Sequence, residues 1–88
     1  MTYEENEVLL KKTFSALLKS SVAESGCTIK EAAEKCKISD RQLSNLENRI
    51  SLPKFITLVN IALEFNLDLN QYLVSIREQG YIPIDKEK

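Results

Sequence analysis

The chain has 88 residues, of which 43% are apolar and 28% charged, with a net charge of -1. These values are typical of one soluble globular domain and argue against a disordered chain. The longest stretch without a charge, Phe55 to Leu63, is far too short to cross a bilayer, which takes about 20 apolar residues. The start of the chain also lacks a basic segment followed by an apolar one, so we expect a cytoplasmic protein without a membrane partner.

The charge is unevenly distributed along the chain. Residues 1–27 sum to -1, residues 28–54 to +2 and residues 55–88 to -2. Because Lys and Arg supply most nonspecific affinity for the phosphate backbone, the acidic total argues against a nucleic-acid binder. The small basic surplus in the middle is compatible with ordinary solvated surface as well.

Catalytic and metal chemistry have little support in the sequence. Cys27 and Cys36 would lie roughly 13 Å apart along one helix, beyond disulfide reach, and no His or third Cys completes a zinc site. We expect both thiols to be small core residues. With no Gly-rich phosphate loop and only scattered carboxylates, we expect no catalytic residue, no metal, no cofactor and no small-molecule substrate.

Five helices are predicted from their start signals. A capping side chain stands three residues before an acid or amide in each of four segments, Thr2–Glu5, Thr28–Glu31, Ser39–Gln42 and Asp68–Gln71. Pro53 suits the first turn of a further helix between the last two. No segment alternates convincingly like a strand, except for the short stretch 81–84, so the fold class is all-α.

Apolar spacing supports the same five helices. Each has residues at intervals of three and four, namely Leu10, Phe14, Leu17 and Leu18; Ile29, Ala32, Ala33 and Cys36; Leu43, Leu46 and Ile50; Phe55, Leu58, Val59 and Ala62; and Leu69, Tyr72, Leu73 and Ile76. The fourth helix adds Ile56, Ile61, Leu63 and Phe65. It is therefore apolar over most of its circumference, so it is either central to the core or covered by a partner.

The end of the chain is predicted to be a tail. Gly80 ends the fifth helix, so residues 1–80 form one domain and residues 81–88 follow it. Tyr81, Ile82 and Ile84 are apolar and need a surface, before the charged end Asp85–Lys88. The tail either folds back on its own domain or crosses to a second subunit.

Residues 28–49 form the most informative unit. Only Lys37 and Ile38 separate the second helix from the cap Ser39, a connection that forces two helices to cross steeply. Ala33 is small where the helices approach, and Ile38 would fill the corner between them. This is the geometry of a helix-turn-helix, although an ordinary αα-corner has the same spacing.

A wider pattern resembles a known family. Gly26-Cys27-Thr28, Glu31-Ala32-Ala33, Ile38-Ser39, Leu43 to Glu47, Pro53, Leu58, Ile61-Ala62, Leu67 to Leu69 and Tyr72-Leu73 resemble the phage repressor-like (lambda repressor/Cro, XRE-type) helix-turn-helix family. The resemblance implies a five-helix lambda-repressor-like domain. It also implies a homodimer that binds double-stranded DNA and regulates transcription, usually as a repressor.

The resemblance makes the third helix, Asp40–Asn48, the recognition helix. Leu43 and Leu46 take its apolar side, so its polar residues face outward. Arg41 and Gln42 are expected to reach base edges first, followed by Asn45, because Arg pairs with guanine and Gln or Asn with adenine. The DNA-binding residues predicted in this way are Lys30, Asp40, Arg41, Gln42, Ser44, Asn45, Asn48, Arg49 and Lys54. Lys30, Ser44, Arg49 and Lys54 are assigned to phosphate, which sets register without reading sequence.

Several residues depart from the family pattern. Ile29 replaces a Gln that contacts the DNA backbone, Lys37 and Arg49 replace Gly residues, and Val22 replaces a basic residue that often pairs with the family's Glu, here Glu47, leaving Lys19 as its partner. Asp40 would repel phosphate unless it accepts from cytosine. These departures keep a second hypothesis open, a protein-interaction module of the same fold, antirepressor-like or an adaptor, with a protein partner and weak or no DNA binding.

Overall fold

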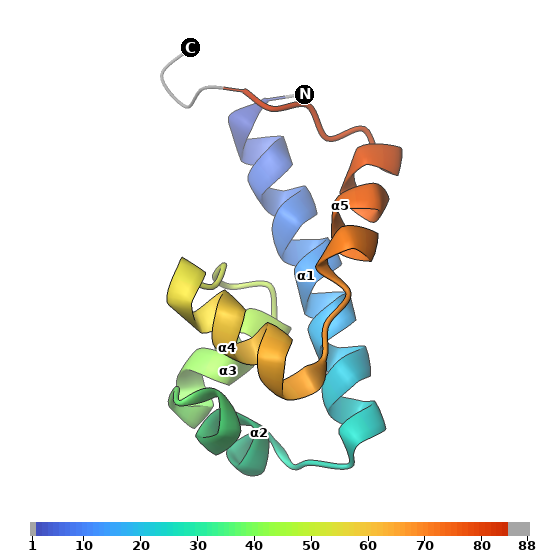
Figure 1. The fold of residues 1–88 in the computed structure, drawn as a ribbon. Coiled ribbons are helices and arrows are strands. Elements are labelled where there is room, and N and C mark those ends of the chain that lie inside the picture. Colours follow the sequence, from blue (N-terminus) through green and yellow to red (C-terminus); the bar gives the residue numbers. More distant parts are fainter. Residues whose placement is uncertain (1, 85–88) are drawn as a thin grey trace.

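The computed structural model describes residues 2–84, and within them the chain forms five α-helices and no strand (Figure 1). The helices are α1 (Tyr3–Ser25), α2 (Ile29–Cys36), α3 (Asp40–Glu47), α4 (Phe55–Phe65) and α5 (Leu69–Glu78). The predicted all-α class and the number of helices are confirmed.

Side-chain caps begin most of the helices. Thr2, Thr28 and Ser39 each accept a hydrogen bond from the backbone N–H three residues later, and the side chain of that residue accepts in return from the cap's own N–H. At α5, Asp68 accepts from the N–H of Gln71 at 2.9 Å. These caps satisfy donors that the first helical turn leaves without a partner.

The fourth helix begins differently from the prediction. Its N-cap is Lys54, with an extended backbone and no side-chain cap, so Pro53 lies just outside the helix and not in its first turn. At the far end of the chain, α5 ends at Glu78, and Gly80 follows with a φ of 93°. Gly80 therefore ends the helix as predicted, because a residue without Cβ adopts that backbone at little cost.

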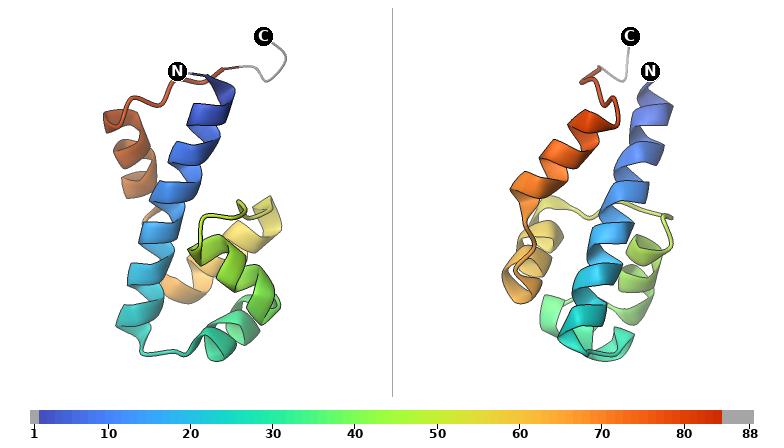
Figure 2. Two further views of the ribbon diagram at one scale, coloured as in Figure 1. Left: turned by 180° about the vertical axis from the view of Figure 1, so that it is seen from behind. Right: turned by 90° about the vertical axis from the view of Figure 1, so that its right-hand side faces the viewer.

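The long helix α1 is the axis on which the others pack. It contacts α3, α4 and α5, while α2 packs on α3 and α4 (Figure 2). The core of buried apolar side chains is formed by Phe14, Leu18, Val22, Ala32, Ala33, Cys36, Leu43, Leu46, Ile61 and Leu67. The edge of the Tyr72 ring stands on Phe14, with centroids 6.0 Å apart, and the Tyr72 hydroxyl donates to the carbonyl of Leu10. Burial raises the pKa of Tyr72 to about 12.

Five residues of the predicted apolar stripes are exposed instead, namely Ile29, Ile50, Phe55, Val59 and Leu73. Ile29 is the first residue of α2, Ile50 lies beyond the end of α3, and Phe55 starts α4 on the side away from the core. Ile61 is the residue of α4 that is fully buried. The fourth helix is therefore not enclosed by the core: one side packs inside and the other is open to solvent.

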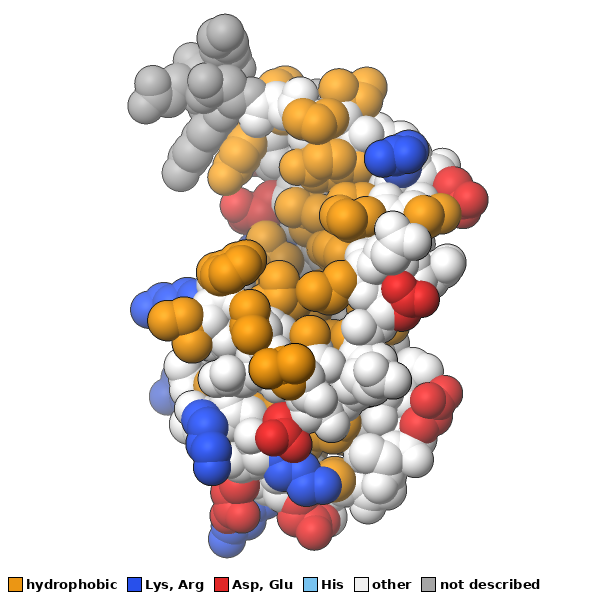
Figure 3. Space-filling view, viewed as in Figure 1, with side chains coloured by type: hydrophobic (Ala, Val, Ile, Leu, Met, Phe, Trp, Pro, Cys, Tyr) orange, Lys and Arg blue, Asp and Glu red, His pale blue; other side chains and the backbone are white. Residues whose placement is uncertain are grey.

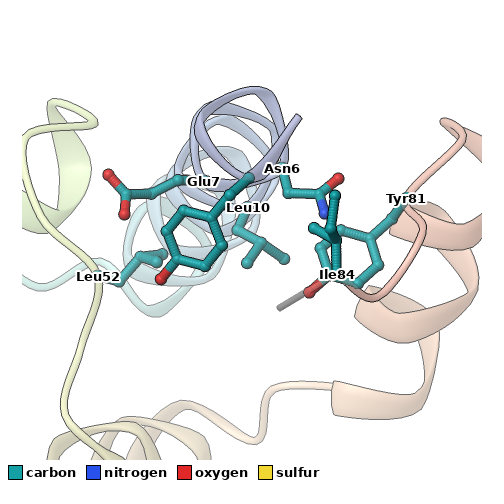
Figure 4. A pocket seen from close by; sticks show the side chains of 7 residues that line it. Asn6, Glu7, Leu10, Leu52, Tyr81 and Ile84 are labelled. Atoms are coloured by element: carbon teal, nitrogen blue, oxygen red, sulfur yellow. The ribbon is translucent and has the colours of Figure 1, made fainter. Parts of the chain in front are cut away.

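The tail folds back on its own chain. The side-chain amide of Asn6 in α1 donates to the carbonyl of Ile82 at 2.7 Å, and Asn6 is itself buried. Tyr81 and Ile84 lie beside Leu10, around a small hollow of about 110 Å³ next to the start of α1 (Figure 4). The tail has neither helical nor strand structure through Ile84, and the predicted charged end Asp85–Lys88 lies outside the described residues.

Within residues 2–84, no helix is both long and apolar enough to cross a bilayer.

Candidate nucleic-acid interface

The turn between α2 and α3 has the predicted geometry. Lys37 ends α2 in the left-handed conformation, with φ 62° and ψ 39°, and its N–H bonds back to Ala33 and Glu34. The N–H of Ile38 donates to the carbonyl of Ala33 at 3.1 Å, and the half-buried Ile38 side chain packs against the core. Ala33 is fully buried where the helices approach. The small Ala33 and the packed Ile38 side chain together hold α2 and α3 in place relative to each other.

The orientation of α3 decides whether it can read DNA. Leu43 and Leu46 are buried in the core. The opposite side of the helix carries Arg41 and Asn48, which are both exposed, and Gln42 is exposed at the edge of the buried side. The polar side of α3 is therefore open to solvent and is not packed inside the molecule. A helix anchored in this way can place its outer side chains in a groove.

The predicted base-reading residues are in different states. Arg41 is exposed and makes no hydrogen bond or ion pair with any residue of the described chain, so its guanidinium is available. Gln42 uses its side-chain oxygen to accept from the N–H of Ser39 at 2.9 Å. A Gln reads adenine with both its oxygen and its nitrogen, so Gln42 would first have to release the cap. Asn45 is half-buried. Its backbone carbonyl accepts hydrogen bonds from the backbone N–H groups of Ile50 and Ser51, which follow the helix.

Further along α3, two predicted residues are bonded to each other. The side-chain amide of Asn48 donates to the hydroxyl of Ser44 at 3.1 Å. Asn48 is the C-cap, so α3 ends at Glu47, one residue before the predicted end. Asp40 is exposed in the first turn, where a negative charge is favoured by the helix dipole.

One predicted phosphate-binding residue, Lys54, lies beside two predicted base-reading residues, while Arg49 and Lys30 lie elsewhere. Lys54 lines a shallow pocket of about 210 Å³ together with Gln42 and Asn45, between α3 and the start of α4. Arg49 follows the other end of α3 with a φ of 62°, and it is exposed. Lys30 lies one helix away, in the first turn of α2, and does not line that pocket. The three cations therefore come from three different segments, the residue before α4, the turn after α3 and the first turn of α2.

The starts of α2 and α3 keep some donors available. The capping boxes use the N–H groups of Glu31 and Gln42, while the first two N–H groups of each helix have no cap partner. The hydrogen bonds to the Thr28 backbone and side chain lower the pKa of Glu31 below its usual 4.5, so this carboxylate stays charged in the cap. The free N–H groups suit phosphate oxygens.

The departures from the family pattern have physical consequences. Lys37 and Arg49, which stand at positions of Gly in the family, both have a left-handed backbone. Val22 is buried in the core. Burial raises the pKa of Glu47, against the opposing effect of the Lys19 charge, and its Oε2 is buried without a hydrogen-bond partner. The predicted pairing of Lys19 with Glu47 is not formed as an ion pair within the described residues; the Lys19 charge lowers the pKa of Glu47 only in part and does not offset the effect of burial.

The cysteines differ from each other. Cys36 is fully buried, as predicted, and burial raises its pKa. Cys27 is only half-buried; bonds from Ser25 and from the Lys35 ammonium, 3.2 Å from its sulfur, lower its pKa. The contact between Lys35 and Cys27 was not predicted, because a spacing of eight residues does not suggest it. The described residues contain no group of three His, Cys, Asp or Glu side chains that could hold a metal ion.

Comparisons with known proteins agree with this geometry. The Helix-turn-helix family matches residues 18–72, which include all of α2, α3 and α4. Two solved structures of the clp gene regulator ClgR from Corynebacterium glutamicum are similar. One has a TM-score of 0.68 at 24% identity, covering 80% of this chain and 74% of the other. The second has a TM-score of 0.67 at 25% identity, covering 78% and 88%.

Among curated proteins, none matches the chain. The family match spans more than half of its length and contains the exposed helix α3 with its buried anchors. The chain therefore belongs to the XRE-type helix-turn-helix family of DNA-binding transcriptional regulators.

Proposed function

We propose that the protein is a sequence-specific DNA-binding regulator that acts as a repressor, with α3 in the major groove of a duplex. The observation that carries this proposal is the position of α3: Leu43 and Leu46 fix it to the core, while Arg41 is exposed and bonded to no described residue. The ClgR structures, similar in fold, are described as those of a gene regulator. This role fits the cytoplasmic location predicted from the sequence. It does not need any catalytic activity.

The roles of individual residues follow from their states. Arg41 is assigned to guanine, because its guanidinium is free to pair with two acceptors of that base. Asn45 is the next base-reading residue. Gln42 reads adenine only when its oxygen leaves the Ser39 cap. Lys54, Arg49 and Lys30 contact phosphate around α3, and the free N–H groups at the starts of α2 and α3 add to these contacts.

The proposal is tested by selecting bound duplexes from a random DNA pool and measuring affinity for the selected site by fluorescence anisotropy. Affinity should fall by about 0.9 log unit per log unit of salt for each phosphate neutralised. Arg41→Ala should weaken specific binding by about 5- to 150-fold, equivalent to about 1–3 kcal/mol, and leave nonspecific binding nearly unchanged.

A matched control is Arg77→Ala, which removes an exposed cation from α5. It should leave the affinity for the selected site unchanged. Lys54→Ala should weaken binding to all sequences alike and reduce the salt slope by about one. The proposal fails if no duplex is enriched at low salt, or if Arg41→Ala and Arg77→Ala weaken specific binding equally.

The acidic balance and the exposed side of α4 support a second candidate, a protein-interaction module. Phe55, Ile56 and Leu63 are all open to solvent on this helix. Ile29, also exposed, cannot donate the hydrogen bond to DNA that the family pattern supplies there. Co-purification of a different protein, together with no DNA retention at low salt, would favour this candidate over the first.

A further inference from the structure

The two ends of the Gln42 side-chain amide are in different states. Its oxygen accepts from the backbone N–H of Ser39 at 2.9 Å, which closes the capping box of α3. Its nitrogen makes no hydrogen bond within residues 2–84, and the residue is exposed. An amide nitrogen carries two N–H donors and no acceptor. While the cap is closed, Gln42 therefore offers only donors to a ligand.

The capping boxes of α1 and α2 are closed by carboxylates instead. In α1 the carboxylate of Glu5 accepts from the N–H of Thr2, and in α2 Glu31 does the same for its own cap. A carboxylate satisfies the cap but carries no donor. Among the three boxes of the described chain, that of α3 is the one closed by an amide. The amide keeps the cap and adds two donors at the start of the exposed helix.

The cap also determines where these donors lie. Because its oxygen is bound at Ser39, the amide of Gln42 stays at the N-terminal end of α3. The N-terminal residues of a recognition helix are those that contact base edges in the major groove. Hydrophobic side chains gather over α4 and α5 in Figure 3, and α3 lies behind α4 in the same view of Figure 1. The start of α3 is therefore on a different side of the molecule from these apolar side chains.

We propose that Gln42 keeps its cap on DNA and selects a keto base, guanine or thymine, on the strand that it faces. In the major groove guanine presents O6 and N7, and thymine presents O4, all of which accept hydrogen bonds. Adenine and cytosine present an amino group there, N6 or N4, which is a donor. Two donors that face each other are both left unsatisfied, which weakens binding. Adenine is therefore disfavoured at this position, because pairing with it needs the oxygen that closes the cap.

This inference rests on the proposed function, since Gln42 meets a base only if α3 enters the groove. It adds the chemical class of base that one side chain selects. A base pair has one keto base and one amino base in the major groove, so the two possible partners of Gln42 can be distinguished at a single pair.

The test is selection from a random DNA pool with the wild type, Gln42→Ala and Gln42→Glu. The position that Gln42 faces is the one at which Gln42→Ala loses its preference, by about 5-fold or more. Gln42→Glu keeps an oxygen for the cap and exchanges the donors for an acceptor, so it should select cytosine at this position. The strand with this cytosine is the strand that residue 42 faces. On that strand the wild type should have guanine or thymine.

A second measurement does not need the Glu variant to fold. In the site selected by the wild type, the keto oxygen or the amino group of this base pair is removed with a base analogue, and affinity is measured by fluorescence anisotropy. Loss of the keto oxygen should weaken wild-type binding by about 5-fold or more and leave Gln42→Ala unaffected. Loss of the amino group should affect neither protein.

Gln71→Glu is the matched control for the added charge. Gln71 is exposed and stands three residues after the cap Asp68 of α5, as Gln42 stands three residues after Ser39. This substitution should leave the selected sequence unchanged. Amide hydrogen exchange of Ser39, slow in the wild type and in Gln42→Glu but faster in Gln42→Ala, checks that the cap is closed.

The possible failures are distinguishable. The inference is overturned, while the proposed function stands, if a duplex is enriched but wild-type binding depends on the amino group of this pair and not on the keto oxygen. The same holds if Gln42→Ala changes no position of the selected site, if Gln71→Glu changes the site as Gln42→Glu does, or if Ser39 exchanges equally fast in the wild type and Gln42→Ala. If no duplex is enriched at low salt, the proposed function and this inference are both refuted.

Discussion

Replacing Lys37 with Gly should stabilise the protein, because this residue holds a left-handed backbone with φ 62° and ψ 39° at the end of α2. For a residue with a Cβ this conformation costs about 1–2 kcal/mol. Glycine avoids that cost, but it lowers the free energy of unfolding by about 0.5–1 kcal/mol because the unfolded chain gains conformational freedom. The net gain is therefore about 0.5–1 kcal/mol. In thermal unfolding it corresponds to a rise in Tm of about 3–6 °C for a domain of this length.

Three further variants isolate the backbone effect from the loss of charge. Lys37→Ala removes the ammonium group but keeps the Cβ, so it should bring no gain. Arg49→Gly, at a φ of 62°, should stabilise like Lys37→Gly. Gly26→Ala should lose about 1 kcal/mol through strain alone, since a Cβ there meets no atom within 4 Å at a φ of 74°. An unchanged or lower Tm for Lys37→Gly, or an equal rise for Lys37→Ala, would refute the reasoning.

Two other substitutions test the helix-turn-helix unit itself. Burial raises the pKa of Glu47 above its ordinary 4.5, so the folded state holds the proton more tightly than the unfolded state and stability falls as pH rises through the folded pKa. Glu47→Gln should therefore be more stable than the wild type at pH 7, with the difference shrinking toward pH 4; urea unfolding at several pH values measures it, and a constant difference would contradict the assignment. Ser39→Ala removes the bond to the N–H of Gln42 and should destabilise by about 1 kcal/mol, whereas Ser20→Ala, at an exposed position of α1, should have little effect. Equal Tm values for the two Ser variants would show that the cap contributes nothing.

Local chemistry explains which parts of the fold could be predicted. Thr2, Thr28, Ser39 and Asp68 mark helix starts because a cap and its partner are only three residues apart in the sequence. The prediction from Pro53 started the helix two residues too early, because Lys54, though not a typical capping residue, adopts the extended N-cap conformation and α4 begins at Phe55. In α3 the apolar Leu43 and Leu46 lie on one side and polar residues on the other. This contrast between the two sides made it possible to predict which side faces outward.

The same contrast is absent in α4, and there the predicted apolar stripe was wrong at Phe55 and Val59, which are exposed. With apolar residues on nearly all sides, the spacing could not tell that Ile61 faces the core and Phe55 faces solvent. Asn6 is buried through a bond to Ile82, a contact between distant residues that no local pattern announces. In the site, the occupied oxygen of Gln42 and the bond between Ser44 and Asn48 depend on side-chain conformations that spacing does not determine.

The contact between Asn6 and Ile82 joins residues 76 positions apart. One hydrogen bond and a few apolar contacts offset little of the entropy lost in closing such a loop. We therefore expect the tail to detach as a small cooperative unit, far below the free energy of global unfolding, with fast amide hydrogen exchange in its own backbone. Each detachment exposes more of Leu10, which lies beside Tyr81 and Ile84. The apolar area that a chain shows to its surroundings thus fluctuates with the tail.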